Sequence, residues 1–168
     1  MMIHYTNTNN PIDFPTPALK HAKGNLLDMA ERGNFDIIVQ GCNCFNTMGG
    51  GIAREIRERY PQCAEVDAAT QYGDYMKLGT WTYHKEPKFT IINAYTQYNM
   101  STGEDVFEYT AFQLILEKLA RLGPARFGFP YIGMGLAKGN KEVILIMLED
   151  FAKGISDMGG SVTLVEFA

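Results

Sequence analysis

The chain lacks a surplus of positive charge and any long apolar run. Its 15 lysine and arginine side chains are outnumbered by 19 aspartate and glutamate side chains, which gives a formal net charge of −4. This balance provides no general attraction to nucleic acid or to anionic membranes. No stretch approaches the ~20 consecutive apolar residues of a membrane-spanning helix, and the first residues lack the apolar core of a signal peptide. We therefore expect a cytoplasmic protein that does not bind membranes.

Cysteine is also scarce. Cys42, Cys44 and Cys63 are odd in number and lack the spacing of a disulfide framework. The three histidines of the chain form no recognisable ligand spacing with them. No nearby base accompanies the cysteines, as a nucleophilic thiol would require. We expect small, buried, reduced thiols, no metal and no cofactor.

The two best-known phosphate-binding motifs are missing. The glycine-rich segment at residues 49–51 lacks the lysine and Ser/Thr of a P-loop and the spacing of a dinucleotide fingerprint. It nevertheless follows an apolar strand at residues 37–39 and opens into a helix near Ile52. Glycines let backbone N–H groups approach a phosphate without an intervening Cβ atom, and a helix N-terminus favours negative charge. The segment therefore predicts a phosphate cradle of another kind, with Asn43 and Asn46 where a nucleotide kinase would carry lysine.

Length and hydrophobic pattern predict one α/β domain over residues 1–168. A chain of 168 residues that is 46% hydrophobic and 20% charged suits a single full-sized core. The expected strands are residues 2–7, 19–23, 36–41, 80–84, 89–94, 126–130 and 161–167. The expected helices are residues 27–32, 51–60, 63–72, 106–122 and 141–155. Their alternation predicts a central mixed, mainly parallel sheet with helices on both faces.

The polar and glycine-rich loops of the chain follow strands. One follows each of the expected strands that end near residues 24, 41, 94 and 130. Ligands of such sheets bind beyond the carboxyl ends of the strands. A second glycine turn at residues 131–136 would thus face the first one at residues 49–51. Two such turns across one cleft could hold two phosphates, or the two halves of a diphosphate.

Four segments of the chain resemble the macro domains, a family that binds ADP-ribose and its derivatives. They are the Gly-Asn-Leu-Leu sequence at residues 24–27, residues 39–53, the strand end at residues 93–94, and the loop at residues 130–136. Residues 39–53 are the most specific, because they combine an asparagine, five further residues, three glycines, Ile-Ala and a helix. The resemblance extends from about Leu19 to Phe167 and is greatest to the branch that contains ADP-ribose-1″-phosphate phosphatases. It implies a three-layer α/β/α macro domain fold. A second similar branch removes ADP-ribose from DNA bases or protein carboxylates.

The resemblance also implies roles for individual positions. Asn25 stands where many macro domains carry an aspartate that accepts a hydrogen bond from the adenine amine, and its amide oxygen could accept the same bond. Asn43 matches an asparagine that faces the distal ribose and helps to hold the water or leaving group. Gln40 replaces another asparagine, which is a histidine in some phosphatases, so Asn43 and Gln40 are the candidate catalytic residues. Phe167 would supply an aromatic ring that stacks on adenine. The expected ligand-binding residues are Gly24, Asn25, Leu26, Asn43, Gly49, Gly50, Gly51, Ile52, Ala53, Ile132, Gly133, Met134, Gly135, Leu136 and Phe167.

Two positions differ from the glycohydrolase branch. Its lysine would lie near Gln97, but no lysine occurs between Lys88 and Lys118. The acidic residue that some of its members carry after the second Gly-x-Gly is Ala137 here. A lysine nucleophile with a supporting carboxylate is therefore not expected. The mechanism that remains is attack by water in a preorganised polar site.

Three functions remain open at this point. The first is hydrolysis of ADP-ribose-1″-phosphate to ADP-ribose and phosphate, which we expect. The second is a glycohydrolase that frees ADP-ribose from a macromolecule, and the third is a reader that binds ADP-ribose without turnover. The expected partners are ADP-ribose or ADP-ribose-1″-phosphate, with nucleic acid only as an ADP-ribosylated substrate.

Overall fold

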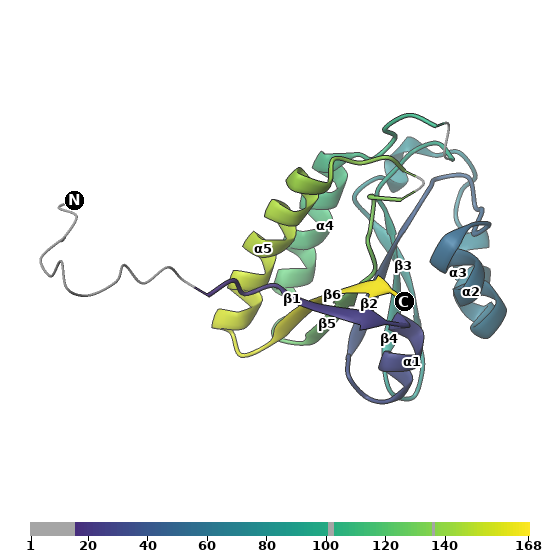
Figure 1. The fold of residues 1–168 in the computed structure, drawn as a ribbon. Coiled ribbons are helices and arrows are strands. Elements are labelled where there is room, and N and C mark those ends of the chain that lie inside the picture. Colours follow the sequence, from purple (N-terminus) through teal and green to yellow (C-terminus); the bar gives the residue numbers. More distant parts are fainter. Residues whose placement is uncertain (1–15, 101–102, 136) are drawn as a thin grey trace, which may run out of the picture.

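The computed structural model describes residues 16–100, 103–135 and 137–168, and its strands form one six-stranded sheet (Figure 1). The strands are β1 (Lys20–Gly24), β2 (Ile37–Cys42), β3 (Trp81–Lys85), β4 (Thr90–Tyr95), β5 (Arg126–Phe129) and β6 (Ser161–Phe167). Their order across the sheet is β1-β6-β5-β2-β4-β3, and only β3 is antiparallel to its neighbour. The expected mixed, mainly parallel sheet is confirmed. The expected strand at residues 2–7 lies outside the described residues.

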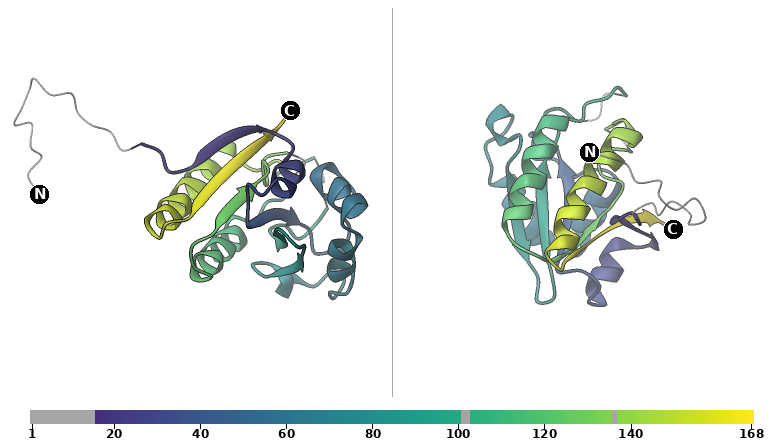
Figure 2. Two further views of the ribbon diagram at one scale, coloured as in Figure 1. Left: turned by 90° about the horizontal axis from the view of Figure 1, so that it is seen from below. Right: turned by 90° about the vertical axis from the view of Figure 1, so that its left-hand side faces the viewer.

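Helices cover both faces of this sheet. They are α1 (Leu26–Glu31), α2 (Gly51–Arg59), α3 (Pro61–Ala68), α4 (Tyr109–Arg121) and α5 (Lys141–Asp157), with a 3₁₀ turn η1 at Tyr75–Lys77. Helices α4 and α5 lie on one face, and α1, α2 and α3 lie on the other (Figures 1 and 2). The expected three-layer α/β/α architecture is therefore confirmed.

The central strand β2 shows how the two helical layers are held. Successive side chains of a strand point to opposite faces of its sheet. Ile38 accordingly packs in the cluster that contains the apolar side chains of α1, α2 and α3, whereas Val39 packs in the cluster of α4 and α5. A strand that is buried on both faces needs consecutive apolar residues, which is why apolar residues run almost without interruption through this segment.

Helices α3 and α4 differ from their expected ranges. Helix α3 begins at Pro61 instead of residue 63, since proline is well suited to the first helical position, and it ends at Ala68 instead of residue 72. Helix α4 begins at Tyr109 instead of residue 106. There, Val106 N–H donates to the Ala137 carbonyl at 2.9 Å, and Phe107 forms a β-bridge with Gln97. These contacts hold residues 106–107 in an extended conformation, so the helix begins only after them.

The parallel strands end together at one edge of the sheet, and this edge positions the candidate site. The loops after β1, β2, β4 and β5 all emerge there, as expected for residues at the carboxyl ends of parallel strands. Within residues 16–100, 103–135 and 137–168, no helix has both the length and the apolar character needed to cross a bilayer.

Candidate functional site

Two adjoining cavities occupy the carboxyl edge of the sheet. We call them the Asn43 cavity, with a volume of about 650 Å³, and the Phe167 cavity, with a volume of about 500 Å³. The residues that line both are Gly51, Ile52, Pro130, Tyr131 and Gly135. These shared walls join the cavities into one groove, and each volume falls in the ~300–1,000 Å³ range of small-molecule sites.

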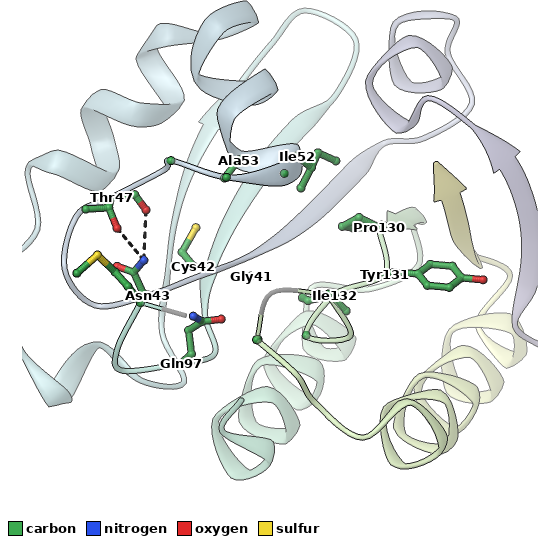
Figure 3. Close-up of a pocket in the computed structure, with 17 residues that line it drawn as sticks. Gly41, Cys42, Asn43, Thr47, Ile52, Ala53, Gln97, Pro130, Tyr131 and Ile132 are labelled. Carbon is green, nitrogen blue, oxygen red and sulfur yellow. Dashed lines mark hydrogen bonds between the residues drawn. The ribbon is translucent and has the colours of Figure 1, made fainter. Parts of the chain in front are cut away.

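The groove collects most of the residues expected to bind ligand. The predicted residues that line the Asn43 cavity are Asn43, Gly49, Gly50, Gly51, Ile52, Ala53, Ile132, Gly133 and Gly135 (Figure 3). Those that line the Phe167 cavity are Gly24, Asn25, Leu26, Gly51, Ile52, Gly135 and Phe167. Met134 and Gln40 line neither cavity, and Leu136 lies outside the described residues. The groove is also lined by residues that were not predicted to bind ligand, among them Cys42, Thr47, Gln97 and Glu55.

The N-terminus of α2 lies between the two cavities. Gly51 has a backbone φ of +55°, a conformation that L side chains rarely adopt, and its neighbour Gly50 is the N-cap. No side chain of the described residues caps this helix. The first N–H groups of a helix have no intrahelical partner and carry its positive dipole end. This part of the groove therefore favours an anionic ligand group, although the whole chain carries net negative charge.

The second glycine loop forms the opposite wall by packing closely against Phe107. Gly133 has a φ of +73°, and a Cβ atom there would lie 2.5 Å from two carbons of the Phe107 ring. The Gly133 carbonyl accepts a hydrogen bond from Gly139 N–H at 2.7 Å, which closes the loop. Both the φ angle and the ring contact require glycine at this position.

Asn43 lies on the wall of its cavity and also holds its own loop together. Its Oδ1 accepts from Phe45 N–H at 2.8 Å, and its Nδ2 donates to Thr47 Oγ1 at 2.8 Å, a bond that is drawn in Figure 3. The two bonds fix the orientation of the amide. Side-chain-to-backbone bonds of this kind are common for asparagine in turns. Asn43 thus combines a structural role with a position from which its amide reaches the cavity.

Gln40 lies beneath the groove instead of within it. Its side chain is 1% exposed, and its Nε2 donates to Asn93 Oδ1 at 2.8 Å. Asn93 in turn donates from Nδ2 to the Cys63 carbonyl at 3.0 Å. Gln40 therefore belongs to a buried polar contact between β2, β4 and α3. Its position differs from that of Asn43 because side chains three residues apart on a strand and its following turn do not share a face.

A buried polar cluster supports the Asn43 loop from behind, and no local pattern in the sequence indicated it. Lys77 is only 7% exposed, and its Nζ donates to Asn46 Oδ1 at 2.7 Å and to Thr70 Oγ1 at 2.8 Å. Nearby, Tyr95 donates from its hydroxyl to Asp67 Oδ1 at 2.7 Å, and burial raises the pKa of the Asp67 carboxyl. Buried charged groups are retained where hydrogen bonds satisfy them. The cluster joins η1 and α3 to the loop that carries Asn43.

The cysteines near the groove are buried thiols with raised pKa values. Cys42, Cys44 and Cys63 are buried and free, as expected. Burial raises the pKa of Cys42, which lines the Asn43 cavity, well above its ordinary value. The nucleophilic form of cysteine is the thiolate, so this thiol is a poor nucleophile. The described part of the chain contains no group of three or more His, Cys, Asp or Glu residues that could hold a metal ion.

Asn25 is committed to a helix cap. Its Oδ1 accepts from Leu27 N–H and Asp28 N–H, each at 3.0 Å, and its Nδ2 donates to Glu55 Oε1 at 3.0 Å. Phe167 lines the same cavity as Asn25, and it is 76% exposed, which leaves its ring accessible. Glu55 was missed because its contact with Asn25 joins residues 30 positions apart in sequence. Only its place one turn after Gly51, on the helix that opens at the groove, could have suggested it.

The chain is similar in sequence to a phage protein. No model of a known protein family matches the chain. The chain is 31% identical over 144 residues to an uncharacterized 17.5 kDa protein from the tk–vs intergenic region of Enterobacteria phage T4. The alignment covers 80% of this chain and 90% of the phage protein. The chain belongs to the family of this phage protein.

Solved structures show which fold this member of the phage protein family has. The macrodomain of Mycobacterium tuberculosis DarG superposes with a TM-score of 0.68 at 17% identity, covering 88% of this chain and 96% of that one. A macrodomain protein from Streptomyces coelicolor gives 0.64 at 19% identity, over 88% and 97% of the two chains. The Trypanosoma brucei macrodomain in complex with ADP-ribose gives 0.62 at 16% identity, over 89% and 63%. The chain therefore has the macrodomain fold, and the expected resemblance is confirmed at the level of fold.

Proposed function

We propose that this protein binds ADP-ribose along the groove formed by the Asn43 and Phe167 cavities. The observation that carries the proposal is the uncapped N-terminus of α2 at the junction of the two cavities, where Gly51 and Gly135 line both. A ligand with a diphosphate at its centre would place that charge against backbone N–H groups. Its two ends would then extend into the two cavities.

One cavity has mainly apolar walls and the other offers hydrogen-bonding groups, and the two ends of ADP-ribose, a base and a ribose, differ in the same way. Leu26, Ile52, Val165 and Phe167 give the Phe167 cavity apolar walls, which suit a flat heterocyclic base. Asn43, Thr47 and Gln97 give the Asn43 cavity hydrogen-bonding groups, which suit a ribose with its hydroxyls. Two proteins of similar fold, the Trypanosoma brucei macrodomain and Thermosipho africanus DarTG, have been solved in complex with ADP-ribose. They support the same ligand class for this chain.

We further propose that the site hydrolyses ADP-ribose-1″-phosphate to ADP-ribose and phosphate. In this proposal the backbone donors of the glycine loops stabilise the phosphoryl oxygens, while the Asn43 amide orients the attacking water or the attacked group. A direct role for Gln40 would require its side chain to leave Asn93 and the protein interior. We therefore assign catalysis to Asn43 and regard Gln40 as a residue that positions β2.

One observation favours a second candidate, a reader that binds ADP-ribose without turnover. Among the described residues that line the Asn43 cavity there is no carboxylate and no histidine, and the Cys42 thiol has a raised pKa. A general base is the usual means of activating water. The reader and the phosphatase would use the same groove.

Phosphate release separates the two candidates. The purified protein is incubated with ADP-ribose-1″-phosphate, inorganic phosphate is measured over time, and ADP-ribose binding is measured in parallel by calorimetric titration. Saturable binding with phosphate release that scales with protein concentration is the expected result. Binding without release from this compound would contradict the phosphatase and favour the reader. The absence of any binding would refute both.

A further inference from the structure

A cluster of aromatic side chains lies on the surface beside the Asn43 cavity. We call it the tyrosine surface, and it consists of Phe45, Tyr72, Tyr75 and Tyr98. The rings of Tyr75 and Tyr98 are stacked with their centroids 3.6 Å apart, and Phe45 packs edge-on against its neighbours. Tyr72 and Tyr75 are each 64% exposed, so the cluster presents aromatic rings to solvent. Contiguous exposed apolar groups of this kind indicate a contact site.

The tyrosine surface is fixed to the loop that carries Asn43. Cys44 N–H donates to the Tyr98 carbonyl at 3.0 Å, and Gly73 N–H donates to the Cys44 carbonyl at 2.7 Å. The Tyr98 hydroxyl in turn donates to the Gly73 carbonyl at 2.9 Å. Gly73 has a φ of +68°, and a Cβ atom there would lie 3.2 Å from the Phe45 ring. The rings are therefore held in place before a partner arrives, which lowers the entropic cost of binding.

The tyrosine surface adjoins the Asn43 cavity. Asn43 lines this cavity and lies two residues before Phe45. Gln97 lines it as well and immediately precedes Tyr98. In the proposed binding mode this cavity holds the ribose at the distal end of ADP-ribose. A polypeptide attached to that ribose would emerge beside the tyrosine surface.

The charge of this region indicates which partner fits it. Only two charged side chains, those of Asp74 and Lys77, occur in the segments that form or adjoin the surface, residues 43–48, 70–78 and 97–100. Lys77 is 7% exposed, and its ammonium donates to Asn46 and Thr70 in the interior. Asp74 forms no ion pair with any described residue, and it adds to the effect of burial in raising the pKa of the nearby Tyr98 hydroxyl. The region thus combines exposed aromatic rings with one unpaired carboxylate.

We propose that the tyrosine surface binds an arginine side chain that flanks the ADP-ribosylated residue of a protein. The inference rests on the proposed binding of ADP-ribose and adds a second contact, made by the molecule to which the ADP-ribose is attached. A guanidinium group stacks on aromatic rings and is attracted to their negative faces, and Asp74 supplies the opposite charge. A nucleic acid would instead bring phosphates to segments that carry no exposed cation. The charge therefore favours a basic peptide.

Calorimetric titration with two peptides tests the proposal. Both carry ADP-ribose at the central residue, joined through the distal ribose by a linkage that resists hydrolysis. Arginines flank that residue in one peptide, and citrullines, which keep the shape of arginine without its charge, flank it in the other. We expect the wild-type protein to bind the arginine peptide about 3- to 30-fold more tightly, as one exposed cation–π contact and one exposed ion pair predict.

Two variants should lower this ratio of affinities. The double variant Tyr72→Ser/Tyr75→Ser removes the two exposed rings, and its ratio should be about two- to fivefold lower than that of the wild type. Asp74→Asn removes the charge but keeps a side-chain oxygen to accept from Met76 N–H at the start of η1. Its ratio should be about 1.5- to 5-fold lower.

Two further variants are matched controls. Tyr83→Ser removes a similarly exposed tyrosine, which lies on β3 and lines neither cavity. Asp157→Asn removes an exposed carboxylate at the end of α5, and it therefore controls for the general attraction between an acidic protein and a cationic peptide. Both controls should keep the wild-type ratio.

Several outcomes would overturn the role of the tyrosine surface and leave ADP-ribose binding intact. They are equal binding of the two peptides by the wild-type protein, an unchanged ratio in the double variant, and an equal fall in Tyr83→Ser. Tighter binding of an ADP-ribosylated single-stranded oligonucleotide than of the arginine peptide would overturn the proposal in favour of nucleic acid. A wild-type dimer that dissociates in the double variant, as measured by sedimentation, would overturn it in favour of a second copy of this chain.

Free ADP-ribose separates failure of this inference from failure of the proposed function. If the wild-type protein bound free ADP-ribose but neither peptide, only the inference would fail. If it bound neither the peptides nor free ADP-ribose, the proposed function would fail and the inference with it.

Discussion

Substitution of Gly133 by alanine is expected to destabilise the protein and to weaken ADP-ribose binding. The backbone φ of +73° strains any residue with a Cβ atom, and that atom would lie 2.5 Å from the buried Phe107 ring. Left-handed strain of about 1–2 kcal/mol and overpacking of about 1–3 kcal/mol predict a loss of roughly 2–5 kcal/mol in the free energy of unfolding. If movement of the loop removes about 1.4 kcal/mol of interaction with the ligand, the dissociation constant rises about tenfold. Chemical denaturation and calorimetric titration measure the two effects.

Gly135→Ala is the matched control for the stability effect. Gly135 lies in the same loop, has no positive φ, and has no atom within 4 Å of the place where a Cβ would stand. Its substitution should therefore change the free energy of unfolding by no more than about 0.5 kcal/mol. Equal stabilities of the two variants would show that neither the φ angle nor the Phe107 contact constrains the loop.

Asn43→Ala is expected to lower the rate of phosphate release while ADP-ribose binding is retained. Asn43 places the amide that is proposed to orient the reacting group, and its loss removes a donor at the site of charge development. Removal of one such donor typically lowers the rate by about 10²–10³-fold. The dissociation constant of ADP-ribose should change by much less, because the proposed binding mode places the diphosphate against the glycine loops and α2. Initial rates with ADP-ribose-1″-phosphate and parallel titrations measure both quantities.

Asn46→Gly controls for general loosening of the same loop. Asn46 has a φ of +56°, which glycine tolerates, and its side chain bonds to Thr70 and Lys77 without lining either cavity. The variant loses loop hydrogen bonds but retains the Asn43 amide, so its rate should remain near that of the wild type at temperatures where it is folded. A comparable fall in rate in both variants would mean that Asn43 acts only through loop structure.

The sequence carried much of the information about the fold. Strands β2 and β4 are nearly continuous apolar runs, because both of their faces are buried, and their positions were predicted within one residue. The start of α4 was wrong by three residues, since the contact between Val106 and Ala137 is tertiary and leaves no local signal. Local patterns thus located the elements, and distant contacts decided where they end.

The candidate site was predictable where backbone conformation demands a particular residue. Glycines at positions 51 and 133 are required by positive φ angles, so the two loops could be identified from sequence alone. The side chains were harder to assign. Asn25 was expected to accept a bond from a base, but its oxygen caps α1, and Glu55 occupies the adjoining wall. Gln40 was expected in the cleft, and the alternation of β2 directs it into the interior.

Titration of ¹⁵N-labelled protein with ADP-ribose, followed by the amide signals of its glycines, tests most directly whether this groove binds ADP-ribose. If ADP-ribose binds in the groove, saturable shifts are expected for Gly49, Gly50, Gly51, Gly133 and Gly135, which line it. Gly154 in α5 and Gly159, which precedes the start of β6 at the opposite edge of the sheet, should not shift. No shift at saturating ligand, or shifts confined to α5 and the opposite edge, would contradict the assignment of this groove as an ADP-ribose site.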